Sequence, residues 1–251
     1  MVSFSDLAPK STTGNVPLIG EIIPSRWSYE ALAVTSFTDN AYEAPLFKTD
    51  QEKYETQFYN FGYVEELQSQ LETMKDEQDK GKEVDPNHIK TIRTNLPVLT
   101  SFCGMAPYQG DYSYPSLRQY LKDAEKTLTE RSNAISLKAD KHISDIIHDR
   151  GKDAVLELKR DNYNLKLEDC VVGADQKKML EVIDNHIVPR MQTIFLTPLN
   201  HWGRAPFYSS VKILGDWHIK TLWFNMCVLL LMCFILSIFL FTDWPGRAIR
   251  K

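Results

Sequence analysis

The histidine, cysteine and carboxylate side chains of this 251-residue chain form no catalytic pattern. No G-x-x-x-x-G-K-[ST] phosphate loop occurs, because Gly81-Lys82 lacks its upstream glycine, and no G-x-S-x-G nucleophile turn is present. His142, Asp145 and Asp149 would share one face of a helix, a spacing far commoner on solvated helices than in metal sites. We therefore predict no catalytic residue, no metal ligand and no cofactor site on this chain.

Two polar side chains stand out because each lies in an otherwise apolar helical segment. Glu30 is the one ionisable residue in the middle of the segment between Pro24 and Asn40. Because an unpaired buried carboxylate is costly, we expect Glu30 to face a polar cavity or cap a neighbouring helix, or else to reach interfacial water. Asn225 lies within the apolar run 221–241. We expect it to bond to a neighbouring helix in a bundle, or to be hydrated near an interface.

The apolar run itself predicts a membrane-spanning helix. Thr221–Phe241 contains 21 residues without a charge. At a rise of about 1.5 Å per residue the run extends roughly 31 Å, which matches a hydrocarbon core roughly 30 Å thick. Three Lys or Arg residues follow it in 242–251 and two precede it in 211–220, which weakly favours a cytoplasmic C-terminus. Aromatic residues resembling interfacial belts flank the run: Trp202, Phe207, Tyr208, Trp217 and Trp244.

Composition excludes several classes of protein. The 29 Lys and Arg residues against 33 Asp and Glu residues contain no basic cluster, so the electrostatic footprint of a nucleic-acid-binding protein is missing. Four cysteines are too few for a disulfide scaffold. Two of them lie in the apolar run, which leaves Cys103 and Cys170 as the one possible bridge, and the sequence does not decide whether they meet. Residues 1–10 lack the features of a secretory signal.

Apolar periodicity predicts that the polar body is mainly α-helical. We expect one helix between Pro24 and Asn40, capped by Ser25, and long charged helices between Asp50 and Arg190. One apolar face in this region consists of Val64, Leu67, Leu71 and Met74. A second consists of Leu117, Leu121, Ala124, Leu128, Ile135, Ala139, Ile143 and Ile146.

The second apolar face is interrupted at Arg131, where the next apolar residue should stand. Two heptads and a break are too few for a coiled coil, so we expect a helical hairpin packed on its neighbours. Shorter helices should follow at about 151–171 and 174–187, the latter stopped by Pro189.

The segment Ile23–Leu32 (IPSRWSYEAL) carries a family resemblance. It resembles a stretch of bacterial ABC exporters of the G subfamily, the white and pleiotropic-drug-resistance type, which follows their fifth transmembrane helix and forms re-entrant helices on the outer side. The residues that carry the resemblance are Pro24, Trp27, Tyr29, Glu30, Ala31, Leu32 and Phe37. Residues 1–9 look like the exit from the fifth helix, and the run from Ile219 looks like the sixth and last.

The resemblance implies a C-terminal part of the permease region with an enlarged loop between the last two helices. The implied division is a re-entrant outer segment (1–48), a helical extracytoplasmic insert (49–197), an interfacial connector (198–220), a transmembrane helix (221–241) and a cytoplasmic tail (242–251). The expected fold class is therefore a mainly α membrane-protein fragment. It would lie in the inner membrane, with most of the chain extracytoplasmic and the C-terminus cytoplasmic.

The expected function is a non-catalytic part of an ATP-driven exporter. The ATP and Mg would be held by a partner ATPase domain, and the other partners would be the remaining permease helices, a second permease protomer and the lipid bilayer, with no nucleic acid. The motif residues would border the outer end of the translocation path, and Asn225 would pack in the helix bundle. The alternative is a tail-anchored single-pass protein with a helical interaction domain.

Overall fold

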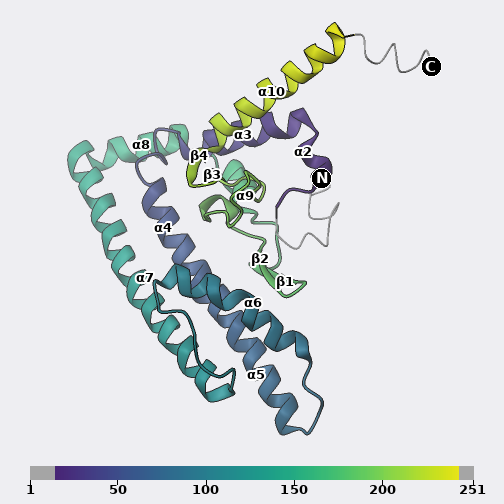
Figure 1. The fold of residues 1–251 in the computed structure, drawn as a ribbon. Helices are drawn as coiled ribbons and strands as arrows, with labels where there is room; N and C mark the ends of the chain where they lie inside the picture. The colour runs from purple at the N-terminus through teal and green to yellow at the C-terminus, as the bar shows by residue number, and fades with distance from the viewer. Residues whose placement is uncertain (1–14, 243–251) are drawn as a thin grey trace.

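The computed structural model describes residues 15–242 as a mainly helical chain with two β-hairpins (Figure 1). The first half contains α2 (Leu18–Glu21), α3 (Pro24–Thr38), α4 (Phe47–Gln57), the π-helix η1 (Phe58–Val64), α5 (Glu65–Asp79) and α6 (Pro86–Cys103). The second half contains α7 (Tyr114–Arg150), α8 (Lys152–Asn162), α9 (Leu165–Val172), β1 (Leu180–Ile183), β2 (His186–Pro189), the 3-10 helix η2 (Thr193–Phe195), β3 (Val211–Leu214), β4 (Trp217–Lys220) and α10 (Thr221–Phe241).

Helices η1, α5, α6 and α7 contain most of the larger of two apolar core clusters among the described residues. Helices α4, η1 and α5 follow one another without a break, and α6 and α7 pack beside them (Figure 1). The predicted apolar face of α5 is confirmed, since Val64, Leu67 and Leu71 are at most 1% exposed. They meet buried leucines and isoleucine from the neighbouring helices: Ile92, Leu96, Leu99, Leu117, Leu121 and Leu128.

Helix α7 is a single helix of 37 residues, rather than a hairpin, and it packs along α4, η1, α5 and α6. The first six residues of its predicted apolar face are buried, whereas Ile143 is 43% exposed. Arg131, which interrupts the face, lies within α7, with its guanidinium 4.7 Å from the centre of the Phe102 ring and its Nη1 donating to the Phe102 carbonyl oxygen. The interruption is therefore accommodated at the surface of the core.

The prediction of a helix at 174–187 was wrong, because β1 and β2 form an antiparallel hairpin there. Its two-residue turn, Asp184-Asn185, has φ of 47° and 64°, which Asp and Asn tolerate better than other non-glycine residues. The expected helix at 151–171 is two helices, α8 and α9. Helix α3 is confirmed, but it begins at Pro24 in the first helical position, and Ser25 is not its cap.

The second hairpin leads directly into α10. Strands β3 and β4 are antiparallel, and β4 ends at Lys220, the residue before α10. Helix α10 packs on α3, and the two run in opposite directions: Asp39 after α3 pairs with Lys220, whereas Trp27 near the start of α3 lies against Phe224 (Figure 1).

Only one face of α10 is covered. Its buried residues are Thr221 and Asn225, and residues 233–241 are exposed throughout. Within residues 15–242, α10 is the one helix long and apolar enough to cross a membrane. The predicted aromatic belts are only partly described: Trp202 and Trp217 are 83% and 73% exposed beside the start of α10, and Trp244 lies outside the described residues.

Gly203 allows the connector to lie directly against α10, and its replacement should test that contact. Its φ is +76°, and a Cβ there would lie 2.6 Å from the Phe224 ring. We expect Gly203→Ala to lower the free energy of unfolding by about 2 kcal/mol or more, because the clash adds to a left-handed strain of roughly 1–2 kcal/mol. The measurement is denaturant unfolding of the full chain in detergent micelles.

Gly81→Ala is the matched control, since Gly81 has a φ of +66° and an added Cβ there would meet no atom within 4 Å. It should show the backbone strain alone. Equal losses for the two variants would contradict the close contact between Gly203 and Phe224.

Candidate functional site: a buried ion-pair cluster between α3 and α10

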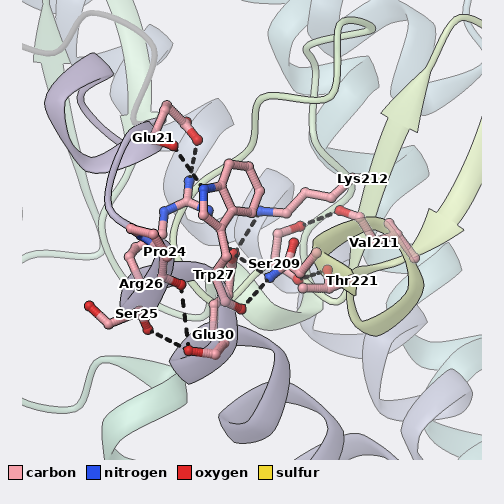
Figure 2. A network of polar contacts seen from close by, with 12 residues as sticks. Glu21, Pro24, Ser25, Arg26, Trp27, Glu30, Ser209, Val211, Lys212 and Thr221 are labelled. Atoms are coloured by element: carbon pink, nitrogen blue, oxygen red, sulfur yellow. Dashed lines mark hydrogen bonds and ion pairs between the residues drawn. The ribbon is translucent and has the colours of Figure 1, made fainter. Parts of the chain in front are cut away.

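Glu30 is fully buried, and three side chains from three elements contact its carboxylate (Figure 2). Arg26 Nη1 lies 3.0 Å from Oε2, and the two residues share a face of α3 because they are four apart. Lys212 of β3 places Nζ 2.6 Å from Oε1. Asn225 of α10 donates from Nδ2 to Oε2 at 3.0 Å and to the Trp27 carbonyl oxygen at 3.0 Å. The carboxylate therefore joins the motif helix to the start of α10.

Glu21 extends the cluster to α2. Its Oε2 lies 2.7 Å from Arg26 Nη2, and its carbonyl oxygen accepts a hydrogen bond from Trp27 Nε1 at 2.8 Å (Figure 2). The guanidinium of Arg26 also stacks on the Trp27 ring at 3.8 Å. The side chain of Arg26 is thus held between two carboxylates and an indole ring.

The four ionisable groups of the cluster balance in charge. Glu21 and Glu30 are acidic, Arg26 and Lys212 are basic, and Lys212 is only 1% exposed. Burial lowers the pKa of the Lys212 ammonium, and the nearby Glu30 carboxylate opposes that shift. Burial raises the pKa of Glu21, and the Arg26 guanidinium opposes that shift. Each ion is tolerated inside the protein because an opposite charge is in contact with it.

Backbone contacts fix the first turn of α10 beside the cluster. Thr221 Oγ1 donates to the Ser209 carbonyl oxygen (Figure 2), and Thr221 N donates to the Ser210 carbonyl oxygen at 3.1 Å. Asn225 follows one turn later and faces Glu30. The segment before β3 and the ion pairs therefore set the direction in which α10 leaves the body.

The cluster assembles only some of the residues singled out in the sequence. It brings together Trp27, Glu30 and Asn225. Pro24 is the first residue of α3, and Ala31 is buried on that helix. The other motif residues lie elsewhere. Phe37 packs against Phe47 and Phe195, Tyr29 lies beside Cys170 and Tyr208, and Leu32 is 66% exposed.

Arg26, Glu21 and Lys212 belong to the cluster, although none of them was predicted from the sequence. The four-residue spacing of Arg26 and Glu30 was a usable signal for an ion pair on one helix. Lys212 is 182 residues from Glu30, and no local pattern marks such a pair. In the sequence it counts only as a charge near the apolar run.

The arrangement holds α2, α3, β3 and α10 together. Residues 15–242 contain no group of three or more His, Cys, Asp or Glu side chains that could hold a metal ion. Both Cys103 and Cys170 are free thiols, which answers the question of their pairing for this structure. Comparison with protein-family models, curated proteins and solved structures found no match.

A second group of ionisable residues lies at the junction of α4, α8 and α9. Glu43 is 8% exposed, and burial raises its pKa to about 7. The carboxylates of Asp50 and Glu168 add to this shift, and Lys159 opposes it. Burial also raises the pKa of Asp50. Protonation of this group should therefore affect how the elements at the junction pack.

The buried cluster predicts a large cost for removing one ion alone. We expect Glu30→Gln to lower the free energy of unfolding by about 3–5 kcal/mol, because Lys212 then stays buried without a counter-charge and Arg26 keeps only Glu21. Adding Lys212→Met should restore part of the loss. Both are measured by denaturant unfolding in detergent micelles. Asp79→Asn is the control, because Lys75 and Asp79 have the same spacing as Arg26 and Glu30. Since this pair is exposed to solvent, the substitution should lower the free energy of unfolding by under ~1 kcal/mol. Similar losses for the two single variants would contradict the burial of Glu30.

The raised pKa of Glu43 predicts that the protein loses stability as pH rises. A carboxyl whose pKa is higher in the folded chain binds its proton more tightly when folded. Its stabilisation is complete below its ordinary value of 4.5 and disappears as pH rises through about 7. We expect Glu43→Gln to reduce the fall in Tm over this range, measured by thermal unfolding at a series of pH values. Glu83→Gln, in the exposed loop before α6, is the control. A Glu43→Gln curve parallel to that of the unmodified chain would contradict the shift.

Proposed function

We propose that the chain is a non-catalytic part of the transmembrane domain of an ATP-driven ABC-type exporter. In this proposal α2 and α3 form the re-entrant outer segment, residues 49–197 form an extracytoplasmic insert, and α10 is the last transmembrane helix. ATP hydrolysis belongs to a partner ATPase domain. Further permease helices and a second permease protomer complete the membrane domain.

One observation carries the proposal: the motif helix lies against the candidate spanning helix and exposes no charge. Between residues 16 and 38 the acidic and basic side chains are Glu21, Arg26 and Glu30, and all three belong to the buried cluster. A helix beside a spanning segment can enter a bilayer only if its charges are paired or removed from lipid. The pairing in the cluster meets this requirement.

The outer surface of α2 and α3 supports the same placement. Four large apolar side chains are 66–75% exposed there: Leu18, Ile19, Ile22 and Leu32. A patch of this kind beside an apolar helix suits lipid or neighbouring membrane helices better than water. A tail-anchored interaction domain in the cytosol would expose the same patch without a partner.

The geometry also supports an indirect mechanism. Because Glu30 bonds to both Asn225 and Lys212, the start of α10, β3 and α3 are held as one unit. ATP-driven movement of the partner domain would displace α10, and the re-entrant segment would move with it. The insert, attached through α4 and the connector, would then change the shape of the outer exit.

Topology tests the proposal. We expect Lys80→Cys, directly after α5, to react with a membrane-impermeant maleimide on intact bacterial cells, because the insert should lie outside the cytoplasm. The variant is made in a background whose four native cysteines are replaced by alanine. Lys251→Cys in the same background is the control and should react only after permeabilisation. Labelling of Lys80→Cys only after permeabilisation would contradict the exporter and favour the tail-anchored alternative.

A further inference from the structure

A cavity of about 340 Å³ lies between η1, α6, the β1–β2 hairpin and the connector. Its volume is at the lower end of the range of small-molecule sites. Phe58, Tyr59 and Tyr63 of the π-helix line one side, and Ile187 and Leu196 line another. The cavity lies away from the ion-pair cluster and has no part in the proposed transport role.

The walls of the cavity are held in place by hydrogen bonds within the protein. Asn95 of α6 uses all of its bonding capacity: Nδ2 donates to the carbonyl oxygens of Thr91 and Asn185, and Oδ1 accepts from Tyr63 and from Ile187 N. The bond to Thr91 lies within α6, and the other three join α6 to η1 and to the hairpin. A ligand would therefore enter a preformed site in which Asn95 is already satisfied.

The π-helix gathers aromatic rings on the cavity side. Tyr63 follows Phe58 by five residues, the spacing of a π-turn, and their ring centroids are 6.2 Å apart. The Tyr59 ring completes the group, with its centroid 5.1 Å from that of Tyr63 and 5.5 Å from that of Phe58. Short π-helical segments occur frequently at functional sites, because they redirect side chains that an α-helix would spread around its axis.

The charge on the cavity lining is negative. Among the described residues that line the cavity, Glu55 is the one carboxylate, and none is Lys or Arg. Glu55 Oε1 accepts a hydrogen bond from Thr197 N at 2.9 Å, and no ion pair to Glu55 occurs among residues 15–242. The one imidazole, His186, has its Nδ1 3.0 Å from the carbonyl oxygen of Asp184. A partly buried carboxylate beside aromatic rings attracts a cation.

We propose that this cavity binds a small organic cation, with an apolar body against the aromatic and aliphatic walls and its ammonium group against Glu55. A neutral molecule of the same shape would gain the apolar contacts alone. An anion would be repelled by Glu55. The proposal does not rest on the transport function, and either can fail while the other holds.

The test compares three probes of similar shape and different charge: 2-phenylethylamine, 2-phenylethanol and phenylacetate. Their dissociation constants are measured at neutral pH by isothermal titration calorimetry with the full chain in detergent micelles, after subtraction of binding to empty micelles. We expect the amine to bind about tenfold or more tighter than the alcohol, as charge-assisted hydrogen bonds imply, and phenylacetate not to bind. Equal binding of amine and alcohol, or no saturable binding of the amine, would overturn the proposal.

Three variants assign the effect to the cavity. Glu55→Gln keeps an acceptor for Thr197 N but removes the charge, and it should bring the ratio of the amine and alcohol constants close to one. Glu52→Gln is the control. Glu52 lies on the same helix as Glu55 but outside the lining, where it pairs with Lys138 of α7, so its replacement should leave the ratio unchanged. Val98→Phe fills the cavity and should weaken both probes by about tenfold, because the added ring occupies the space of the ligand's apolar body.

Each variant is checked by far-ultraviolet circular dichroism and by its unfolding transition before binding is measured. Val98→Leu replaces Val98→Phe if the larger ring prevents folding. Retention of the ratio in Glu55→Gln, or of amine binding in a folded cavity-filling variant, would place the binding elsewhere and refute the site.

Discussion

The position of α10 depends on the burial of a single carboxylate. A buried ion without counter-charges costs several kcal/mol, so Glu30 can be 0% exposed only when its partners are present. Those partners come from α3, β3 and α10, and most of the chain separates α3 from the other two elements. Such a cluster adds little net stability compared with an apolar core of the same shape. Its physical effect is to reject other arrangements of the three elements, because each would leave an ion unpaired.

This constraint explains how one helix can be polar in its attachment and apolar elsewhere. Thr221 and Asn225 bond to the body within the first five residues of α10, and residues 233–241 contact little of the chain. The surface that remains on α10, α2 and α3 carries no acidic or basic side chain outside the cluster. The attachment therefore combines hydrogen bonds of Thr221 and Asn225 with the packing of Phe224 on Trp27, and the apolar surface beyond it stays exposed.

Long apolar periodicities in the sequence predicted α3, α5 and α7 because many residues repeat the same signal. The four-residue strands of both hairpins are too short to give one, and the turn pair Asp184-Asn185 was the missed indication at the first. Asn225 was detected because a polar residue is conspicuous in an apolar run. Lys212 was not, because its importance arises from a contact 182 positions away that only tertiary structure creates.

Residues 195–212 link the cavity and the ion-pair cluster through packed residues. Phe195 and Leu196 are adjacent, yet Phe195 belongs to the apolar cluster beneath α3 and Leu196 to the core of the insert. Thr197 is then bonded to Glu55, and the chain continues into β3, which carries Lys212. Because Lys212 is bonded to Glu30 at one end of this segment and Thr197 to Glu55 at the other, the segment cannot shift against α3 and α4 without disturbing one of the two carboxylates. Glu30 and Glu55 thus hold the two ends of the segment that leads from the larger core to β3.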